Sequence, residues 1–427
     1  MKMKMKRLAF VGVVVLLCSL FLAALPATAI AAEEDDFVLD IYGNANEDDT
    51  IDMRDLTYVK LIFFGEKSET EFADAKYDGE INPLDFVQIK LVIVGKEEEL
   101  TIVDTAGRIV TIKKPVERIV SSHPGITEAL KIVDAWDRVV GRDSSTSDPI
   151  LYSNLDELPV VSQPPYDLNY EEVFELHPDI VLVVAAPMPG FDDVVATLEP
   201  EIPVVALNFW EPETILENFQ KLGFILGQEE EAEEFIEFYK RVEADISKVT
   251  SKIPEKDKPR LFYKGGGAVT GLIMTLTDTW PGIPYRYELT GSINIAADLP
   301  GISGWVEVDP EWLVVQDPDV VISYSQNQDI LGLGVDDTSA AEAFRNEIME
   351  LDVFSGGTAV KNGDVYVTAW VFGTPKYIVG LTYRAKWLHP DLLQDLDPKA
   401  IHQEYLTKFM RIDYDLKKHG VFAYPEP

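Results

Sequence analysis

The chain has 427 residues, enough for two or three compact units of ordinary domain size. Hydrophobic residues make up 46% of it, as in globular proteins, and 74 acidic residues stand against 37 basic ones. This acidic excess leaves no basic stripe that would neutralise phosphates, which excludes nucleic acid as the expected partner. Cys18 is the only cysteine, so no disulfide is expected even outside the cytoplasm.

Residues 1–32 have the pattern of an export signal. Lys2, Lys4, Lys6 and Arg7 precede an uncharged run from 8 to 25, which small alanines follow. We therefore predict that 1–32 is a signal peptide and that the protein is exported to the cell surface or a periplasm-like space. The uncharged run is also long enough to form a spanning helix, so an uncleaved membrane anchor is the alternative.

Residues 36–97 contain two similar acidic loops, each followed by an apolar segment. The loop that starts at Asn44 can be laid over the one that starts at Asp74, position by position, so that Asp55 falls on Asp85. Oxygen-bearing groups recur at a spacing suited to Ca²⁺, which takes about six to eight oxygen ligands. Lys76 interrupts this spacing in the second loop, and Asp49 replaces a turn glycine in the first. The predicted calcium ligands are Asn44, Asn46, Asp48, Thr50, Asp52, Asp55, Asp74, Asp78, Glu80, Asn82 and Asp85.

This arrangement resembles a dockerin, a calcium-dependent docking module built from two loop–helix repeats. The resemblance covers most of the segment 44–95 and implies bound Ca²⁺ and a cohesin-like partner. We expect a small all-α calcium-loop module at 36–97. The alternative is an acidic solvated linker, which would have no reason to repeat its apolar positions as well.

From residue 99 onward, short apolar runs alternate with helical stretches, which predicts parallel sheets covered by helices. Between them, 229–249 is charged, lacks Gly and Pro, and carries apolar residues along one face, so one long helix is expected. The predicted fold is α/β, with two Rossmann-like lobes joined by one rigid helix. The expected units are a first lobe at 99–227, the linking helix at 228–252, a second lobe at 253–390 and a C-terminal helical extension at 391–427, packed on the second lobe. Strands are expected at 119–120, 139–140, 160–161, 180–184, 204–207, 260–263, 320–322 and 365–367.

The second lobe echoes the first in sequence. The stretch that starts at Glu172 can be set beside the one that starts at Glu311, with one extra residue before a shared Pro-Asp pair. Each stretch predicts a helix, a Pro-Asp stop and a buried strand.

From residue 101 to about 389 the chain resembles the class III periplasmic binding proteins of ABC importers, which carry iron chelates or cobalamin. The resemblance implies a receptor that captures an iron chelate and delivers it to a permease, with a corrinoid or haem as the alternative cargo. In this family each lobe presents a carboxylate to the permease, a role that the resemblance assigns to Glu128 and Glu311. Four stretches carry the likeness by their order and spacing, namely 118–130, 169–183, 289–296 and 308–323.

A ligand between two lobes is contacted by loops at the ends of strands. Aromatic walls suit bulky planar chelates, and the basic groups Lys264 and Arg286 suit an anionic one. His123 follows a strand end, where it would contact the ligand or cap the next helix. The predicted ligand contacts are Ser122, His123, Trp210, Lys264, Tyr285, Arg286, Trp305, Tyr324 and Trp370.

Three other functions compete with this receptor. One is a surface interaction protein with an empty binding fold, which would bind no small ligand at all. A receptor for bare zinc or manganese needs several converging imidazoles, but the chain has only five histidines and three of them lie near the C-terminus. A scaffold-docked extracellular enzyme lacks support from any Gly-x-Ser-x-Gly or His-Glu-x-x-His motif. The sequence therefore favours a protein that binds and does not catalyse.

Overall fold

The structure, a computed structural model, describes residues 37–164, 166–185, 190–265, 273–300, 304–369 and 374–427. Residues 39–427 form one compact unit. The predicted signal peptide or anchor lies outside the described residues. Within the described ranges, no helix combines the length and the apolar character needed to cross a membrane.

The first lobe is built on a six-stranded sheet with the order β6-β5-β4-β3-β7-β8. The strands are parallel except for β6, which is antiparallel to β5. Ile119, Val181 and Val204 are fully buried, as expected for a sheet covered on both faces. An antiparallel hairpin, β1 with β2, precedes this sheet. The elements are β1 (Glu99–Val103), β2 (Ile109–Lys113), β3 (Ile119–Ser121), α4 (Pro124–Ile132), β4 (Val139–Asp143), β5 (Val160–Gln163), β6 (Asp167–Leu168), α5 (Tyr170–Leu176), β7 (Ile180–Val183), α6 (Phe191–Leu198), β8 (Val204–Ala206) and α7 (Ile215–Leu226).

The second lobe has a five-stranded sheet with the order β11-β9-β13-β14-β15, parallel except for β15. Phe262, Val321 and Val367 from its strands form a core with Leu313 and Phe344 from its helices. A separate antiparallel pair joins β10 to β12. The elements are β9 (Arg260–Lys264), β10 (Met274–Leu276), α9 (Ile283–Leu289), β11 (Ile293–Asn294), β12 (Trp305–Glu307), α10 (Pro310–Gln316), β13 (Val320–Tyr324), α11 (Ser339–Met349), α12 (Thr358–Asn362), β14 (Val365–Thr368), α13 (Tyr377–Leu388), α14 (Pro398–Glu404) and β15 (Ala423–Tyr424).

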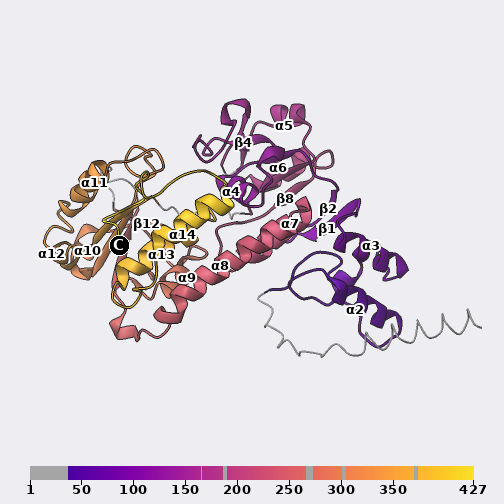
Figure 1. Cartoon of the computed structure of the whole chain (residues 1–427), viewed down its shortest axis with the longest axis horizontal. Helices are drawn as coiled ribbons and strands as arrows, with labels where there is room; N and C mark the ends of the chain where they lie inside the picture. Colours follow the sequence, from indigo (N-terminus) through magenta and orange to yellow (C-terminus); the bar gives the residue numbers. More distant parts are fainter. Residues whose placement is uncertain (1–36, 165, 186–189, 266–272, 301–303, 370–373) are drawn as a thin grey trace, which may run out of the picture. The chain divides into compact units, whose positions relative to one another are not determined.

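A single helix, α8 (Glu229–Thr250), connects the two sheets, as the sequence predicts. Its apolar face buries Phe235, Tyr239, Val242 and Ile246. The helix packs against α4 and α7 on one side and against α9 and α13 on the other (Figure 1). All eight predicted strands are also present, because each follows an apolar run that is largely buried in a sheet.

The N-terminal residues form two loop–helix units, with α2 (Met53–Phe63) and α3 (Pro83–Ile93). Each helix begins with a capping box, formed by Asp52 with Asp55 and by Asn82 with Asp85. Backbone hydrogen bonds join this segment to β1, from Tyr42 N–H to the Thr101 carbonyl and from Val103 N–H to the Asp40 carbonyl, both 2.9 Å. The two units therefore belong to the same compact body as the lobes.

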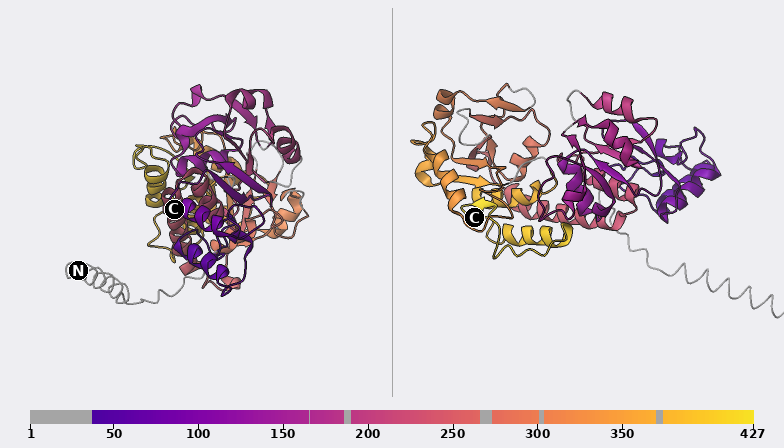
Figure 2. Two further views of the ribbon diagram at one scale, coloured as in Figure 1. Left: turned by 90° about the vertical axis from the view of Figure 1, so that its right-hand side faces the viewer. Right: turned by 90° about the horizontal axis from the view of Figure 1, so that it is seen from above.

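The C-terminal segment differs from the helical extension that the sequence predicts. It continues from α14 through a π-helical turn (Tyr405–Phe409) but ends in β15, which adds an antiparallel edge to β14. It also reaches the first lobe, where Arg411 Nη1 donates to the carbonyls of Lys131 (2.9 Å) and Ile132 (3.0 Å). Phe409 packs edge-on against Phe235 of α8, and α14 runs close to that helix (Figure 2). The segment thus contacts both lobes and the helix between them.

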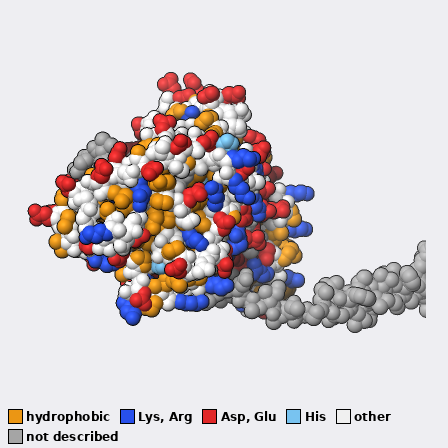
Figure 3. Space-filling model, turned by 60° about the vertical axis from the view of Figure 1, so that its left-hand side comes forward, with side chains coloured by type: hydrophobic (Ala, Val, Ile, Leu, Met, Phe, Trp, Pro, Cys, Tyr) orange, Lys and Arg blue, Asp and Glu red, His pale blue; other side chains and the backbone are white. Residues whose placement is uncertain are grey.

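Charge on the surface is mixed rather than uniform. On the face drawn in Figure 3, acidic side chains gather along the upper rim, and basic side chains lie mainly toward the right-hand side. Hydrophobic side chains are visible between them. The acidic excess of the sequence therefore does not make this face a single negative field.

Candidate ligand-binding cleft

Loops at the carboxyl ends of both sheets line one cavity of about 530 Å³. The first lobe contributes the loops after β3, β4 and β5, and the second lobe contributes those after β13 and β14. His402, Tyr405 and Met410 of the C-terminal segment line it as well. Its volume lies within the roughly 300–1,000 Å³ of small-molecule sites, and the carboxyl ends of parallel strands are where α/β folds bind ligands.

His123 is placed at this cavity by the start of α4. It is the N-cap residue, and its Nδ1 accepts a hydrogen bond from the Gly125 N–H at 3.1 Å. Burial lowers the pKa of His123 to about 4, so the ring is neutral near pH 7. Because Nδ1 is an acceptor, the neutral ring carries its proton on Nε2. His123 therefore caps the helix and also offers a ligand a hydrogen-bond donor.

The lowered pKa of the half-buried His123 predicts a pH dependence of stability. The unfolded chain takes up this proton near pH 6.5, before the folded chain does. The contribution of the neutral ring to the free energy of unfolding is therefore complete above pH 6.5. It falls by roughly 3 kcal/mol as the pH drops from 6.5 to about 4. His123→Asn keeps a capping side chain that does not titrate. Urea unfolding at pH 7.5 and 4.5 should show a smaller acid loss in the variant, and equal losses would contradict a neutral ring.

Ser122 and Trp210 stand beside His123. The Trp210 ring is buried, and its centroid lies 5.2 Å from that of His123. Ser122 is also buried, and its carbonyl accepts a hydrogen bond from Ser162 Oγ at 3.1 Å. The Ser122 hydroxyl has no hydrogen-bond partner within the described part of the chain. The structure therefore brings together the three contacts predicted in the first lobe, with His123 at the cavity itself.

Aromatic side chains of the second lobe form a wall at the end of β13. Tyr324 stacks on Tyr263, with 5.8 Å between centroids and 13° between planes, and Trp305 lies 6.4 Å from Tyr324. A Cβ atom at Gly265 would come within 1.9 Å of the Trp305 ring, so this close packing requires glycine. Trp305 and Tyr324 are half-buried. Trp370, also predicted as a contact, lies outside the described residues.

Of the remaining predicted contacts in the second lobe, Lys264 and Arg286 are buried and Tyr285 is half-buried. Lys264 is only 1% exposed, and burial lowers its pKa. The Tyr285 hydroxyl donates to Glu243 Oε1 of α8 at 2.6 Å. Arg286 Nη2 donates to the Trp210 carbonyl at 2.8 Å and so connects the second lobe to the first. The structure thus gives Tyr285 and Arg286 contacts across the junction of the lobes.

Glu128 is not presented to solvent, which disagrees with the permease-docking role expected of it. It is 2% exposed, and its Oε1 accepts hydrogen bonds from the Lys376 N–H and the Tyr405 hydroxyl, both at 2.7 Å. The Lys376 ammonium lies 3.3 Å from Oε2. Glu128 is therefore used inside the protein, where it joins α4 to the second lobe and the C-terminal segment.

Glu311 is exposed in the first turn of α10, and a matching helix exists in the first lobe. Asn169 caps α5 and Asp309 caps α10, and the buried Val173 and Leu313 follow at the same distance from each cap. Both helices also end in a left-handed residue, at His177 (φ 45°) and at Asp317 (φ 42°), again at equal distance. These three equivalences hold together without any insertion. The alignment with one extra residue is therefore wrong, and the counterpart of Glu311 is Glu171, which is also exposed.

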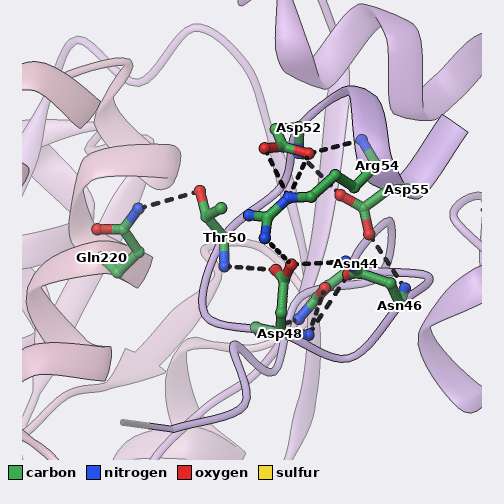
Figure 4. A network of polar contacts seen from close by, with 8 residues as sticks. All are labelled: Asn44, Asn46, Asp48, Thr50, Asp52, Arg54, Asp55 and Gln220. Atoms are coloured by element: carbon green, nitrogen blue, oxygen red, sulfur yellow. Dashed lines mark hydrogen bonds and ion pairs between the residues drawn. The ribbon is translucent and has the colours of Figure 1, made fainter. Parts of the chain in front are cut away.

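In the first N-terminal loop, a basic side chain lies among the predicted calcium ligands (Figure 4). Nitrogen atoms of Arg54 lie 2.9 Å from Asp48 and 2.9 Å from Asp52. Asp55 accepts the N–H groups of Asn46 and Asp52, and burial raises its pKa to about 6. Among the described residues, no group of three or more His, Cys, Asp or Glu side chains is arranged to hold a metal ion. The loop thus gathers acidic groups around a positive charge.

The second loop repeats this backbone pattern. Asp85 accepts the N–H groups of Lys76 at 3.0 Å and of Asn82 at 2.7 Å, as Asp55 does in the first loop. Asp74 accepts the N–H groups of Asp78 and Gly79. The acidic side chains therefore support the shape of the loop through hydrogen bonds of their own.

Sequence reasoning missed Lys376, Tyr405 and Arg384. Lys376 and Tyr405 reach Glu128 from distant parts of the chain, a pairing that no local pattern reveals. Arg384 left a signal, because it and Lys386 are the two charges within a mostly apolar helical stretch. It lines a second, smaller cavity in the second lobe together with Arg286.

Residues 119–369, more than half of the chain, match the family described as periplasmic binding protein. YvrC of Bacillus subtilis, an uncharacterised ABC transporter substrate-binding lipoprotein, is 24% identical over 301 residues, which cover 69% of this chain and 87% of YvrC. A cobalamin-binding protein of Halobacterium salinarum is 27% identical over 230 residues, covering 52% of this chain and 58% of that protein. The TroA-like periplasmic binding protein FepB of Veillonella parvula has a similar fold, with a TM-score of 0.61 and 23% identity over 76% of this chain and 98% of FepB.

The matched region begins at β3 and ends just after β14, so it contains α8 and most of both sheets. The loop–helix units and the C-terminal segment lie outside it. The family match agrees with the fold, in which one helix joins two sheets. It also agrees with the ligand-sized cavity at the carboxyl ends of the strands of both sheets. The chain belongs to the periplasmic binding protein family.

Proposed function

We propose that the protein captures an anionic iron chelate outside the cytoplasm and delivers it to the permease of an ABC importer. The cavity of about 530 Å³ carries this proposal, because loops from both lobes line it. His123 supplies a neutral donor there, and Tyr324, which precedes the lining residue Ser325, forms an aromatic cluster with Trp305 at the end of β13. A chelate with oxygen-rich and planar parts uses both kinds of surface.

A corrinoid is the second candidate for the cargo. The observation that favours it is the likeness to a protein named as cobalamin-binding, at 27% identity. A corrinoid would use the aromatic cluster at the end of β13. The two cargoes are therefore distinguished by which of them the protein binds more tightly.

The cargo is tested by titrating the protein with ferric citrate, a ferric hydroxamate, a ferric catecholate and cobalamin, using calorimetry and tryptophan fluorescence. We expect saturable binding of at least one ferric chelate. His123→Ala should weaken it about tenfold, the value of one ordinary hydrogen bond. His419→Ala is the matched control, since His419 is exposed and its ring pairs with Asp336 at 3.1 Å. Tighter binding of cobalamin than of every ferric chelate would favour the second candidate.

The contact with the permease is proposed to use Glu171 and Glu311. Both are exposed, and both lie in the first turn of equivalent helices, one in each lobe. Carboxylates held on rigid helices would set the register of docking through charge-assisted pairing with basic side chains of the permease. Glu128 is left out of this proposal because its carboxylate is already paired.

The first N-terminal loop is proposed to bind Ca²⁺ through the oxygens of Asn44, Asn46, Asp48, Asp52 and Asp55 and the carbonyl of Thr50. The Arg54 guanidinium, 2.9 Å from Asp48 and from Asp52, marks a place where a positive charge is held. Bound Ca²⁺ would supply a stronger charge there and free Arg54 to point into solvent. The second loop is weaker as a candidate, because Lys76 replaces one oxygen.

Calcium binding is tested on the full exported chain by calorimetry and by thermal unfolding in EDTA and in Ca²⁺. Arg54→Ala should tighten Ca²⁺ binding about fivefold, because it removes a competing, largely exposed ion pair worth about 1 kcal/mol. Asp48→Asn should weaken it by at least tenfold, whereas Asp78→Asn in the second loop should change it little. Absence of Ca²⁺ binding to both the natural chain and Arg54→Ala would contradict the proposal.

A further inference from the structure

A small cavity of about 60 Å³ lies inside the second lobe, apart from the large cavity. Helix α9 contributes Arg286 and Tyr287 to its wall, and α13 contributes Tyr377 and Arg384. Two guanidinium groups therefore line one small space. Both side chains are nearly inaccessible, with 4% of Arg286 and 8% of Arg384 exposed.

Arg384 has little to balance its charge. Its guanidinium lies 4.0 Å from the centroid of the Tyr287 ring, and its Nη2 donates to Ser292 Oγ at 3.2 Å. No carboxylate of the described residues lies beside its guanidinium, whose neighbours are Tyr287, Tyr263 and Arg286, and its Nε has no hydrogen-bond partner there. A buried cation without a carboxylate partner carries a large desolvation cost.

Arg286 adds a second positive charge at the same cavity. Its guanidinium lies 4.3 Å from the centroid of the Tyr377 ring and donates to the Trp210 carbonyl. Burial, and then the proximity of Arg286, lower the pKa of Arg384. Repulsion between two buried cations is relieved most directly by an anion placed between them.

Stacking of the Arg384 guanidinium on the Tyr287 ring leaves its in-plane Nε–H available to a ligand. Burial raises the pKa of Tyr287 to about 12, so its phenol remains a neutral hydrogen-bond donor. A space of about 60 Å³ is far smaller than the roughly 300–1,000 Å³ of sites for drug-sized ligands, so it suits a carboxylate, sulfate or phosphate better than a metal chelate.

We propose that the cavity between Arg286 and Arg384 binds one small oxyanion, a site separate from the large cavity. The oxyanion is either a free inorganic or carboxylate ion or an acidic group that the cargo extends into the lobe. The geometry supports this site whatever the identity of the cargo, because both arginines and all of its walls belong to the second lobe.

The test uses the full chain and compares phosphate, sulfate and acetate with chloride at equal ionic strength, by calorimetry and thermal unfolding. We expect saturable stabilisation by at least one oxyanion, weakened at least tenfold in Arg384→Met. Without oxyanion, Arg384→Met should be as stable as the natural chain or more so, because it removes an unbalanced buried charge. Arg345→Met is the matched control, since Arg345 in the same lobe donates to the carbonyls of Gly363 and Val365. This control should lose stability but keep the oxyanion response.

Two results separate the sources of the oxyanion. Binding of phosphate, sulfate or acetate to the protein alone supports a free ion. If none of them binds, a loss of at least tenfold in ferric citrate affinity in Arg384→Met, absent in Arg345→Met, supports an acidic group of the cargo. The proposal is overturned if oxyanion and ferric citrate responses are the same in Arg384→Met and the natural chain, or if neither probe binds. If the protein binds an oxyanion but no chelate, the oxyanion site is supported and the proposed cargo is contradicted.

Discussion

Replacing Glu171 and Glu311 together with glutamine is expected to abolish most cargo delivery while leaving cargo binding unchanged. Each carboxylate would pair with a basic side chain of the permease, and loss of one such pair costs about 2 kcal/mol, or about thirtyfold. The double variant should therefore reduce uptake by more than about a hundredfold at limiting receptor concentration. Uptake into permease-containing vesicles measures the effect, with the cargo Kd determined in parallel.

Glu175→Gln is the matched control for the docking variants, because Glu175 is exposed on the same helix, α5, but outside its first turn. This variant should support cargo uptake at the same rate as the natural chain. Equal loss in Glu175→Gln, or normal uptake in the double variant, would contradict docking through the two equivalent helices. A loss in Glu311→Gln alone would show that the pseudo-equivalent position in the first lobe has another use.

The second large effect concerns Glu128. Glu128→Ala leaves the Tyr405 hydroxyl and the Lys376 N–H without their shared acceptor, and it separates Lys376 from its carboxylate. We expect the free energy of unfolding to fall by about 3 kcal/mol, with the two hydrogen bonds as the main cause, because the Lys376 side chain is 31% exposed and partly hydrated. Urea unfolding measures the change.

Glu404→Ala provides the comparison for Glu128→Ala. Glu404 also joins the C-terminal segment to another element, through Arg241 of α8 at 2.6 Å, but both side chains are at least 40% exposed. Its removal should cost no more than about 1 kcal/mol. Similar losses in the two variants would contradict a buried cross-lobe role for Glu128.

The parts of the fold that the sequence predicted share one property, a strong and local hydrophobic pattern. The strand at 180–184 is apolar throughout, and α8 repeats its apolar residues on one face along its whole length. By contrast β6, β11 and β15 are each too short for a periodic signal. Strand β15 forms because the C-terminal segment pairs with strand β14 at the edge of the sheet. In this pair Tyr424 lies opposite Val367, a residue far from it in sequence.

The candidate site was predictable where a residue's role depends on its immediate neighbours. His123 follows a strand and precedes Pro124 at the start of a helix, and the structure places it at the cavity. Glu128 also lies in a short local sequence pattern, but its role depends on Lys376 and Tyr405, which are distant from it in sequence. The equivalence of Glu171 with Glu311 was established from the N-caps and the left-handed C-terminal residues of both helices. The sequence alone also allowed an alignment shifted by one residue.

The most direct test of the proposed receptor is native mass spectrometry, with absorbance spectroscopy, of the full chain incubated with ferric chelates and cobalamin in competition. We expect one ferric chelate bound per chain, retained after buffer exchange and accompanied by its absorbance band. A chain that remains free of every chelate and of cobalamin would contradict it.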